Sequence, residues 1–194
     1  MRGGIYIPRQ RRIWYPGAIY HVVTRGNRKE DIFKQTEDYN FYMKLLQINN
    51  EKYPFKLYTY CLMKNHIHLQ IATIDDELWK IMRGINWMYS MFFNQKYKLT
   101  GHLFQGRYYA ELIDTESYLL QSSKYIHLNP VKAGIVKKPI QYPWSSYGVF
   151  MGVEGNKLIY DEGVLRCIQG SSRKLYKEYV ESEENDDVVP GTMN

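Results

Sequence analysis

The sequence predicts an α+β fold of the ferredoxin-like, split βαβ type, with an antiparallel sheet, helices on one face and a further helix at the C-terminal end. Three observations predict this fold. Strand and helix patterns follow one another in the order β-α-β-β-α-β-α. The turn signal Lys64-Asn65 joins the second and third strand patterns into a hairpin. The length of 194 residues, 44% of them hydrophobic, suits one domain with a real core.

The first half of the chain predicts one strand, one helix and the hairpin. Residues 17–25 are β-rich and end at Gly26-Asn27. Residues 38–52 have helical spacing, and Pro54 limits their extension. Residues 55–63 alternate and then become continuously apolar, and residues 66–73 form the returning strand. Because crossovers are right-handed, the first and third strands should lie at the centre of the sheet.

The second half supplies a long helix, a strand and the last helix of the domain. Residues 76–98 have a helical pattern that Asp75 or Asp76 can cap. A loop at 101–107 leads to a fourth strand at 108–113. The next helix should begin at Asp114-Thr115-Glu116 and end near Asn129, because Pro130 disfavours the α conformation of the residue before it.

Beyond Gly134 the periodic pattern weakens. Residues 142–147 indicate an aromatic loop, and residues 162–168 and 172–179 two short helices. We therefore divide the chain into four segments, and we expect the acidic tail to be disordered. These segments are a basic leader at 1–14, a domain at 15–136, a C-terminal extension at 137–180 that packs on it, and the tail at 181–194.

The charge distribution predicts a polyanionic partner. The net charge is +6, but residues 178–194 hold six acidic groups and no Lys or Arg, so the preceding 177 residues carry +12. Aromatic residues make up 15% of the chain, and rings beside cations are suited to stacking on unpaired bases. A nucleic acid is the partner that this composition favours.

Several classes are disfavoured. No apolar run approaches the roughly 20 residues that a membrane helix needs, and the N-terminus lacks the apolar segment of a targeting signal. The two cysteines, Cys61 and Cys167, form neither a disulfide framework nor a CxxC site, and Cys61 is expected to be a buried small hydrophobe. We expect a cytoplasmic protein without a membrane partner.

Two histidines separated by one residue, His66 and His68, begin the third strand pattern. Side chains on a strand alternate, so both imidazoles project to one face, about 6.6 Å apart at the Cα atoms. The pair can chelate one metal ion, although such a pair on a half-buried strand can also be purely structural.

The last helix of the domain carries a polar stripe. Tyr118, Gln121, Ser122, Tyr125 and Asn129 recur at helical spacing and so share one side. If this side packs near the histidines, Tyr125 brings a phenol and Asn129 an amide oxygen to the ion. Two imidazoles and one neutral oxygen suit Mg²⁺ or Mn²⁺, and two histidines also suit zinc.

This constellation predicts chemistry on a phosphodiester. A bound cation would polarise the phosphate, and Tyr125 could attack phosphorus to form a covalent phosphotyrosine. Tyr118 is an alternative nucleophile on the same stripe. Two other hypotheses remain: a basic nucleic-acid-binding protein whose histidines are structural, and a zinc-dependent hydrolase that uses bound water.

Longer motifs add a family resemblance. The segments His66-Ile67-His68-Leu69, Cys61-Leu-Met-Lys-Asn65 and Tyr125-Ile-His-Leu-Asn-Pro-Val-Lys-Ala-Gly134 resemble those of the single-tyrosine HUH transposases of the IS200-like superfamily, in the branch of REP-associated tyrosine transposases. Supporting matches are Arg25-Gly-Asn27, Gly101-His-Leu-Phe-Gln-Gly-Arg107 and Pro143-Trp-Ser-Ser-Tyr147. The resemblance spans roughly residues 15–150.

The resemblance implies specific roles. His66, His68 and Asn129 would bind Mg²⁺ or Mn²⁺, Tyr125 would be the catalytic nucleophile, and residues 15–136 would be the nuclease domain. The substrate would be single-stranded DNA, often beside a REP-like hairpin, which the enzyme cleaves and rejoins through a 5′-phosphotyrosine. The resemblance also implies association with the nucleoid, and it leaves open whether two copies form a homodimer. Candidate DNA contacts are Arg25, Asn27, Arg28, Gln105, Arg107, Lys124 and Trp144.

Overall fold

A four-stranded antiparallel sheet with the strand order β2-β3-β1-β4 forms the centre of the computed structural model, which describes residues 13–153, 155 and 157–182. The strands are β1 (Ile19–Arg25), β2 (Phe55–Met63), β3 (His66–Thr73) and β4 (Tyr109–Ile113). The predicted fold class, hairpin and central position of β1 and β3 are confirmed. The histidine pair therefore lies on a strand held on both sides.

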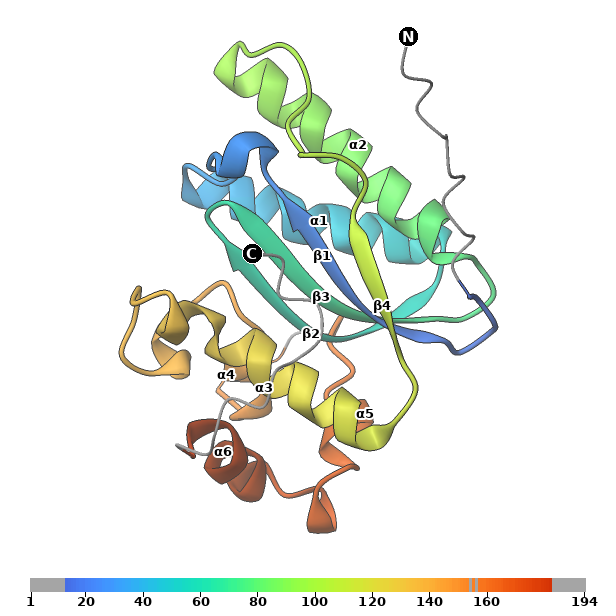
Figure 1. Ribbon diagram of the computed structural model, residues 1–194, viewed down its shortest axis with the longest axis vertical. Coiled ribbons are helices and arrows are strands. Elements are labelled where there is room, and N and C mark those ends of the chain that lie inside the picture. The colour runs from blue at the N-terminus through green and yellow to red at the C-terminus, as the bar shows by residue number, and fades with distance from the viewer. Residues whose placement is uncertain (1–12, 154, 156, 183–194) are drawn as a thin grey trace, which may run out of the picture.

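Two helices cover one face of the sheet, α1 (Thr36–Lys52) and α2 (Leu78–Tyr97) (Figure 1). They approach closely at Gly84, where a Cβ atom would lie 2.4 Å from Oδ1 of Asn49. The Asn49 amide donates to the carbonyl of Ile81 at 2.9 Å, which ties the two helices together. Any larger residue at position 84 would force the Asn49 side chain to move.

The predicted cap of α2 is wrong. The residue before the helix is Glu77, in an extended conformation, and neither Asp75 nor Asp76 caps it. Asp76 instead accepts a hydrogen bond from Lys80 at 2.7 Å, four residues on. The carboxylate thus pairs with a side chain of the first turn rather than with the free backbone N–H groups.

The opposite face is covered by α3 (Glu116–Lys132), with the C-terminal helices beyond it (Figure 1). Thr115 caps α3, because its Oγ1 accepts from the backbone N–H of Tyr118 at 3.1 Å. The remaining elements are short: α4 (Tyr147–Phe150), α5 (Glu162–Leu165), α6 (Arg173–Glu181) and the 3₁₀ turns η1 (Asn27–Lys29), η2 (Pro139–Gln141) and η3 (Gln169–Ser171). The predicted short helices near 162 and 172 are both present.

The predicted end of α3 at Asn129 is wrong, because the helix runs through Pro130 to Lys132. Proline has no backbone N–H to donate, but N–H groups later in the chain donate to the carbonyls of this turn. Ala133 donates to the carbonyl of Asn129 at 3.0 Å, and Ile135 donates to that of Pro130 at 3.0 Å. The Pro130 ring is buried, so packing and these bonds outweigh the local preference.

The C-terminal extension joins the outer edge of β2. The N–H of Leu62 donates to the carbonyl of Trp144 at 2.9 Å, and the N–H of Ser146 donates to that of Tyr60 at 3.0 Å. The Tyr142 hydroxyl adds a bond to the carbonyl of Leu62 at 2.7 Å. These contacts cover a sheet edge that would otherwise be open to pairing.

The buried side chains on the two faces differ. On the α1/α2 side, Tyr20, Val22, Leu69 and Ile71 belong to the large apolar core. A small separate cluster of Cys61, Met63, Ile126 and Tyr142 lies between β2, α3 and the extension, and Cys61 is buried as predicted. The predicted segment boundaries stay predictions, and the leader and most of the tail fall outside the described residues. Within the described ranges, none of the helices has the length and apolar character that crossing a bilayer requires.

Candidate active site

The two histidines of β3 project toward α3. His66 and His68 lie on the face opposite to Ile67, and their ring centroids are 4.9 Å apart. His68 is buried, whereas His66 is half-buried. The strict alternation of the strand thus separates the polar pair from the main core, as the sequence predicted.

Helix α3 brings the two other predicted site residues to this pair. Oδ1 of Asn129 lies 3.3 Å from Nε2 of His66. The ring of Tyr125 is 5.5 Å from that of His68 between centroids, at an angle of 84°. The Asn129 amide nitrogen donates to the carbonyl of Tyr125 at 3.4 Å, so its oxygen faces the histidine. The structure therefore brings His66, His68, Tyr125 and Asn129 together within one chain.

A buried polar bridge fixes α3 over the sheet. The side-chain amide of Gln70 donates to the carbonyl of Leu119 at 2.9 Å and to the hydroxyl of Ser122. The hydroxyl of Thr59 on β2 donates to Oε1 of Gln70 at 3.0 Å. Because Gln70 follows the two histidines on the same face of β3, this bridge sets the height and rotation of α3 above them.

The pKa values of both histidines are lowered, which favours neutral imidazoles. Burial is the main cause for each. The contact between Nε2 of His66 and the Asn129 oxygen opposes the shift at His66, and Arg25 adds to the shift through its charge. For His68 the charges of His21, His66 and Arg25 lower the pKa further. Neutral imidazoles have the lone pairs that a metal needs.

The residues present fit a divalent cation. His66 Nδ1 lies 2.6 Å from Oδ1 of Asn65, so its hydrogen belongs on Nδ1, and the lone pair of Nε2 then faces the carbonyl oxygen of Asn129. Nε2 of His68 is buried without a hydrogen-bond partner in the described chain. No group of three or more His, Cys, Asp or Glu side chains in that part is arranged to hold a metal. A cation here would be held by two imidazoles and the Asn129 oxygen.

A third histidine that the sequence analysis left out of the site, His21, contacts this cluster. It is 1% exposed on β1, and its Nε2 lies 3.0 Å from Nδ1 of His68. Its ring also meets Tyr125 edge to face, with 6.0 Å between centroids. The alternation of β1 and its position beside β3 were the available signals, but the contact depends on the register that pairs Val23 with His68.

Five of the predicted DNA contacts lie at one end of the sheet. Arg25 is opposite His66 in the β1–β3 register. Asn27 and Gln105 lie in adjoining loops, because Gln105 donates to the carbonyl of Arg25 at 2.9 Å and Asn27 to that of Leu103 at 2.8 Å. Arg28 and Arg107 are exposed nearby in the same loops. Their role in binding DNA stays a prediction.

Two other predicted contacts are used inside the protein. Lys124 donates to the hydroxyl of Ser182 at 3.0 Å and lies over the Tyr179 ring at 4.9 Å. Trp144 stacks on Tyr39, with ring centroids 4.4 Å apart. Both side chains connect the C-terminal segment to the rest of the fold.

The alternative nucleophile and the remaining histidine of α3 have different surroundings. Burial, and then the hydrogen bond to Glu111, raise the pKa of Tyr118 far above its ordinary value. His127 is fully buried and bonds to the hydroxyls of Tyr176 and Ser146, each at 2.8 Å. The geometry therefore favours Tyr125 over Tyr118, and His127 is a core histidine.

A sheet that holds a histidine pair beneath a tyrosine-bearing helix is the arrangement of a single-tyrosine transposase. Residues 15–129 match the family model for the IS200-like transposases, and the chain belongs to this family. It is an enzyme of the transposase class.

Two individual proteins are also similar. One is a protein of Haemophilus influenzae strain KW20 Rd that carries the provisional name REP-associated tyrosine transposase. It is 28% identical over 152 residues, covering 71% of this chain and 84% of that protein. The other is a REP-associated tyrosine transposase solved bound to a REP hairpin. It has a TM-score of 0.65 and 19% identity, and the match covers 78% of this chain and 96% of that one. The solved structure supports the fold.

Proposed function

We propose that this transposase cleaves and rejoins single-stranded DNA beside hairpins through a covalent 5′-phosphotyrosine on Tyr125, with the help of Mg²⁺ or Mn²⁺. One observation carries the proposal: Tyr125 and Asn129 of α3 meet His66 and His68 of β3 in one polar cluster. Hairpin DNA is the ligand in the solved relative, and the +12 charge of the first 177 residues suits such a polyanion.

The cluster can carry out two phosphoryl transfers. The Tyr125 oxygen attacks phosphorus, the bond from phosphorus to the 3′ oxygen breaks, and that oxygen leaves as a 3′-hydroxyl after taking up a proton. The phenol proton passes to solvent. In the second transfer a 3′-hydroxyl attacks the phosphotyrosine, loses its proton and releases Tyr125. No bond energy is lost to hydrolysis, so the strand can be rejoined.

Side chains around the tyrosine support this chemistry. Held by His66, His68 and Asn129, a divalent cation would polarise the phosphate and offset the charge that develops in the transition state. Lys132 lies about two helical turns after Tyr125, with its Nζ atom 5.9 Å from the centroid of the Tyr125 ring, and adds positive charge. All four residues of this cluster come from one chain.

The test is an adduct assay. A labelled oligonucleotide that carries a hairpin with single-stranded flanks is incubated with the protein and Mn²⁺, and the covalent complex is measured after denaturation. We expect an adduct that Tyr125→Phe and EDTA both abolish. Tyr118→Phe is the matched control, because it removes the other phenol of the stripe, and it should keep the adduct. An adduct that persists in Tyr125→Phe would refute the mechanism, and strand cleavage without any adduct would favour hydrolysis by water.

A further inference from the structure

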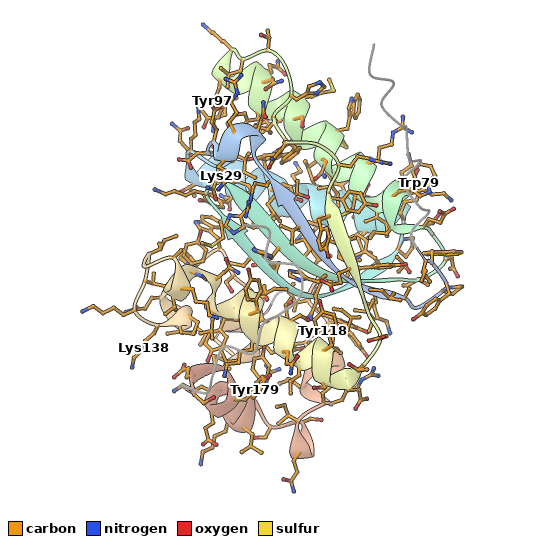
Figure 2. The ribbon with its side chains drawn as sticks, in the orientation of Figure 1. Lys29, Trp79, Tyr97, Tyr118, Lys138 and Tyr179 are labelled. Carbon is orange, nitrogen blue, oxygen red and sulfur yellow. The ribbon has the colours of Figure 1, made fainter. Side chains whose placement is uncertain are left out.

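A groove runs along the outer side of α2, which we call the α2 groove. It has a volume of about 900 Å³ and lies between α2 and the loop at 101–108 that returns to β4. From α2 it is lined by Trp79, Met82, Arg83, Asn86, Trp87 and Ser90, which are related by spacings of three and four residues and so share one side of the helix. Trp79 projects from the first turn of α2 (Figure 2).

The chemistry of the α2 groove suits a nucleotide. Trp87 is 63% exposed and Trp79 is 45% exposed, although large aromatic side chains usually bury most of their surface. The charged lining residues are Arg83 and Arg107, and no described Asp or Glu lines the groove. An aromatic face and two cations match the base and phosphate groups of DNA.

The groove is continuous with the active-site end of the sheet. Its loop is bonded to the end of β1, where the Gln105 N–H donates to the carbonyl of Arg25. Arg25 is opposite His66, and the N–H of Gly26 donates to the carbonyl of Asn65 at 2.8 Å. The histidines face α3 and the groove lies on the α2 side, so a strand that leaves the histidines over Arg25 would pass round this end of the sheet to reach the groove.

From these observations we infer that the α2 groove binds an unpaired nucleotide of the single-stranded flank, with its base on Trp87 and its phosphate at Arg83. The inference rests on the proposed function, because it assigns a further binding site for the same DNA. It makes the groove a determinant of which flank is accepted, since a base must be unpaired to stack there.

Binding without cleavage tests the groove separately from the chemistry. In a Tyr125→Phe background without added metal, fluorescence anisotropy compares a flanked hairpin with the same hairpin without flanks. Trp87→Ala and Arg83→Gln should each weaken binding of the flanked hairpin by about tenfold and leave the bare hairpin unchanged. Arg166→Gln, which removes an exposed arginine far along the chain, is the matched control.

The outcomes separate the two proposals. A loss confined to flanked DNA supports the groove, whereas equal affinity of Trp87→Ala and its parent, or equal losses with and without flanks, overturns it. Because the substituted side chains are exposed, the variants should unfold at the parent temperature, which thermal melting checks. Failure of the proposed function would show instead as a missing adduct in the wild-type protein.

The contact between His21 and His68 carries a second, independent inference. For His68 to offer a lone pair at Nε2, its hydrogen must be on Nδ1, and that atom lies 3.0 Å from Nε2 of His21. The reverse arrangement, with His21 as the donor, would place the hydrogen of His68 on Nε2 and block coordination. We propose that His21 is a positioning residue that accepts this hydrogen and so holds His68 in its metal-binding tautomer.

Substitutions that keep or remove the acceptor test this role. His21→Gln retains an acceptor oxygen, and His21→Phe fills similar space without one. We expect His21→Phe to weaken Mn²⁺ binding, measured by electron paramagnetic resonance, by about 10- to 100-fold, and His21→Gln to restore most of it. Circular dichroism checks that both variants are folded. Unchanged Mn²⁺ affinity in folded His21→Phe would overturn the proposal, as would equal loss in both variants.

A measurement on the unsubstituted chain covers the case in which His21→Phe does not fold. Nitrogen-15 NMR of the histidine rings reports which ring nitrogen carries the hydrogen. In the Mg²⁺-loaded protein, His68 should be protonated at Nδ1 and His21 should be unprotonated at Nε2. A hydrogen on Nε2 of His21 that points to His68 would refute the assigned direction of the bond.

Discussion

The two faces of the sheet are built from alternate residues of the same strands, yet one face is apolar and the other carries the polar candidate site. Toward α1 and α2, β3 presents Ile67, Leu69 and Ile71, each 1% exposed or less. Toward α3 it presents His66, His68 and Gln70. The first face buries apolar area and stabilises the fold, whereas the second fixes polar groups whose nitrogen and oxygen atoms are only partly satisfied. Neighbouring residues of β3 therefore have different roles: one packs in the apolar core, and the next contributes to the polar cluster.

This comparison explains why the site is well held. The polar side loses stability through buried groups without partners, such as Nε2 of His68. The apolar side offsets that loss and keeps β3 rigid, so the two imidazoles do not depend on their own contacts for position. Substitutions on the two faces should therefore have separable effects.

The largest effect is expected from His66→Ala on the α3 side. Adduct formation with Mn²⁺ should fall by about 10³-fold, because the cation loses one of its two imidazoles and the phosphate its polarisation. The free energy of unfolding should change by about 1 kcal/mol or less, since His66 is only half-buried. Single-turnover adduct assays and urea unfolding measure the two quantities. A large loss of stability together with the loss of adduct formation would show that the two faces do not have separate effects.

The counterpart of His66→Ala is Ile67→Ala, which changes the next residue of β3, on the face toward α1 and α2. Removing this buried side chain should lower the free energy of unfolding by about 2–5 kcal/mol, through lost transfer energy and the cavity left behind. The rate of adduct formation per folded molecule should stay at the wild-type level. Urea unfolding, followed by kinetics at a temperature where the variant is folded, checks both points, and a slower folded enzyme would contradict the comparison.

The sequence allowed the faces to be predicted but not all of their contacts. Alternation in β3 and helical spacing in α3 determine which side each residue takes, so the grouping of His66, His68, Tyr125 and Asn129 could be anticipated. The contact of His21 with His68 could not, because it is diagonal across two strands and depends on register.

The remaining differences arise from tertiary packing. Pro130 stays helical because later N–H groups close the turn. Lys124 is engaged by the C-terminal segment, and Trp144 of that segment stacks on Tyr39 of α1. No local pattern predicts the path of the segment. The α2 groove likewise depends on where the loop at 101–108 lies, so neither periodicity nor composition could indicate it.

A buried carboxylate on the α1/α2 side gives the next prediction. Burial alone would raise the pKa of Asp38, but hydrogen bonds from Lys96, Tyr97 and two backbone N–H groups outweigh it and lower the pKa below its ordinary value. Its contribution to stability is therefore present above about pH 4 and lost as the pH falls through the folded pKa. Asp38→Asn should cost about 1–3 kcal/mol at pH 7 and less in acid. Urea unfolding across this range measures it, and an equal cost at every pH would be inconsistent with a charged Asp38.

The smallest effect concerns His127, which links α3 to the C-terminal extension. Burial lowers the pKa of His127 to about 3, whereas an unfolded chain has a histidine pKa of about 6.5. Between these values the unfolded state binds a proton that the folded state does not. The contribution of neutral His127 to the free energy of unfolding is complete above pH 6.5. It is lost as the pH falls, at up to about 1.4 kcal/mol per pH unit.

The slope of stability against pH tests this linkage. Between pH 6.5 and 5, His127→Gln should show a shallower fall in the free energy of unfolding than the wild type, and His102→Gln, an exposed histidine, should not differ from it. Some slope should remain in His127→Gln, since the pKa values of His21, His66 and His68 are lowered as well. The contribution of Asp38 is lost only at lower pH, so mild acid should destabilise the α3 side before the α1/α2 side. An unchanged slope in His127→Gln would mean that the protons are taken up elsewhere.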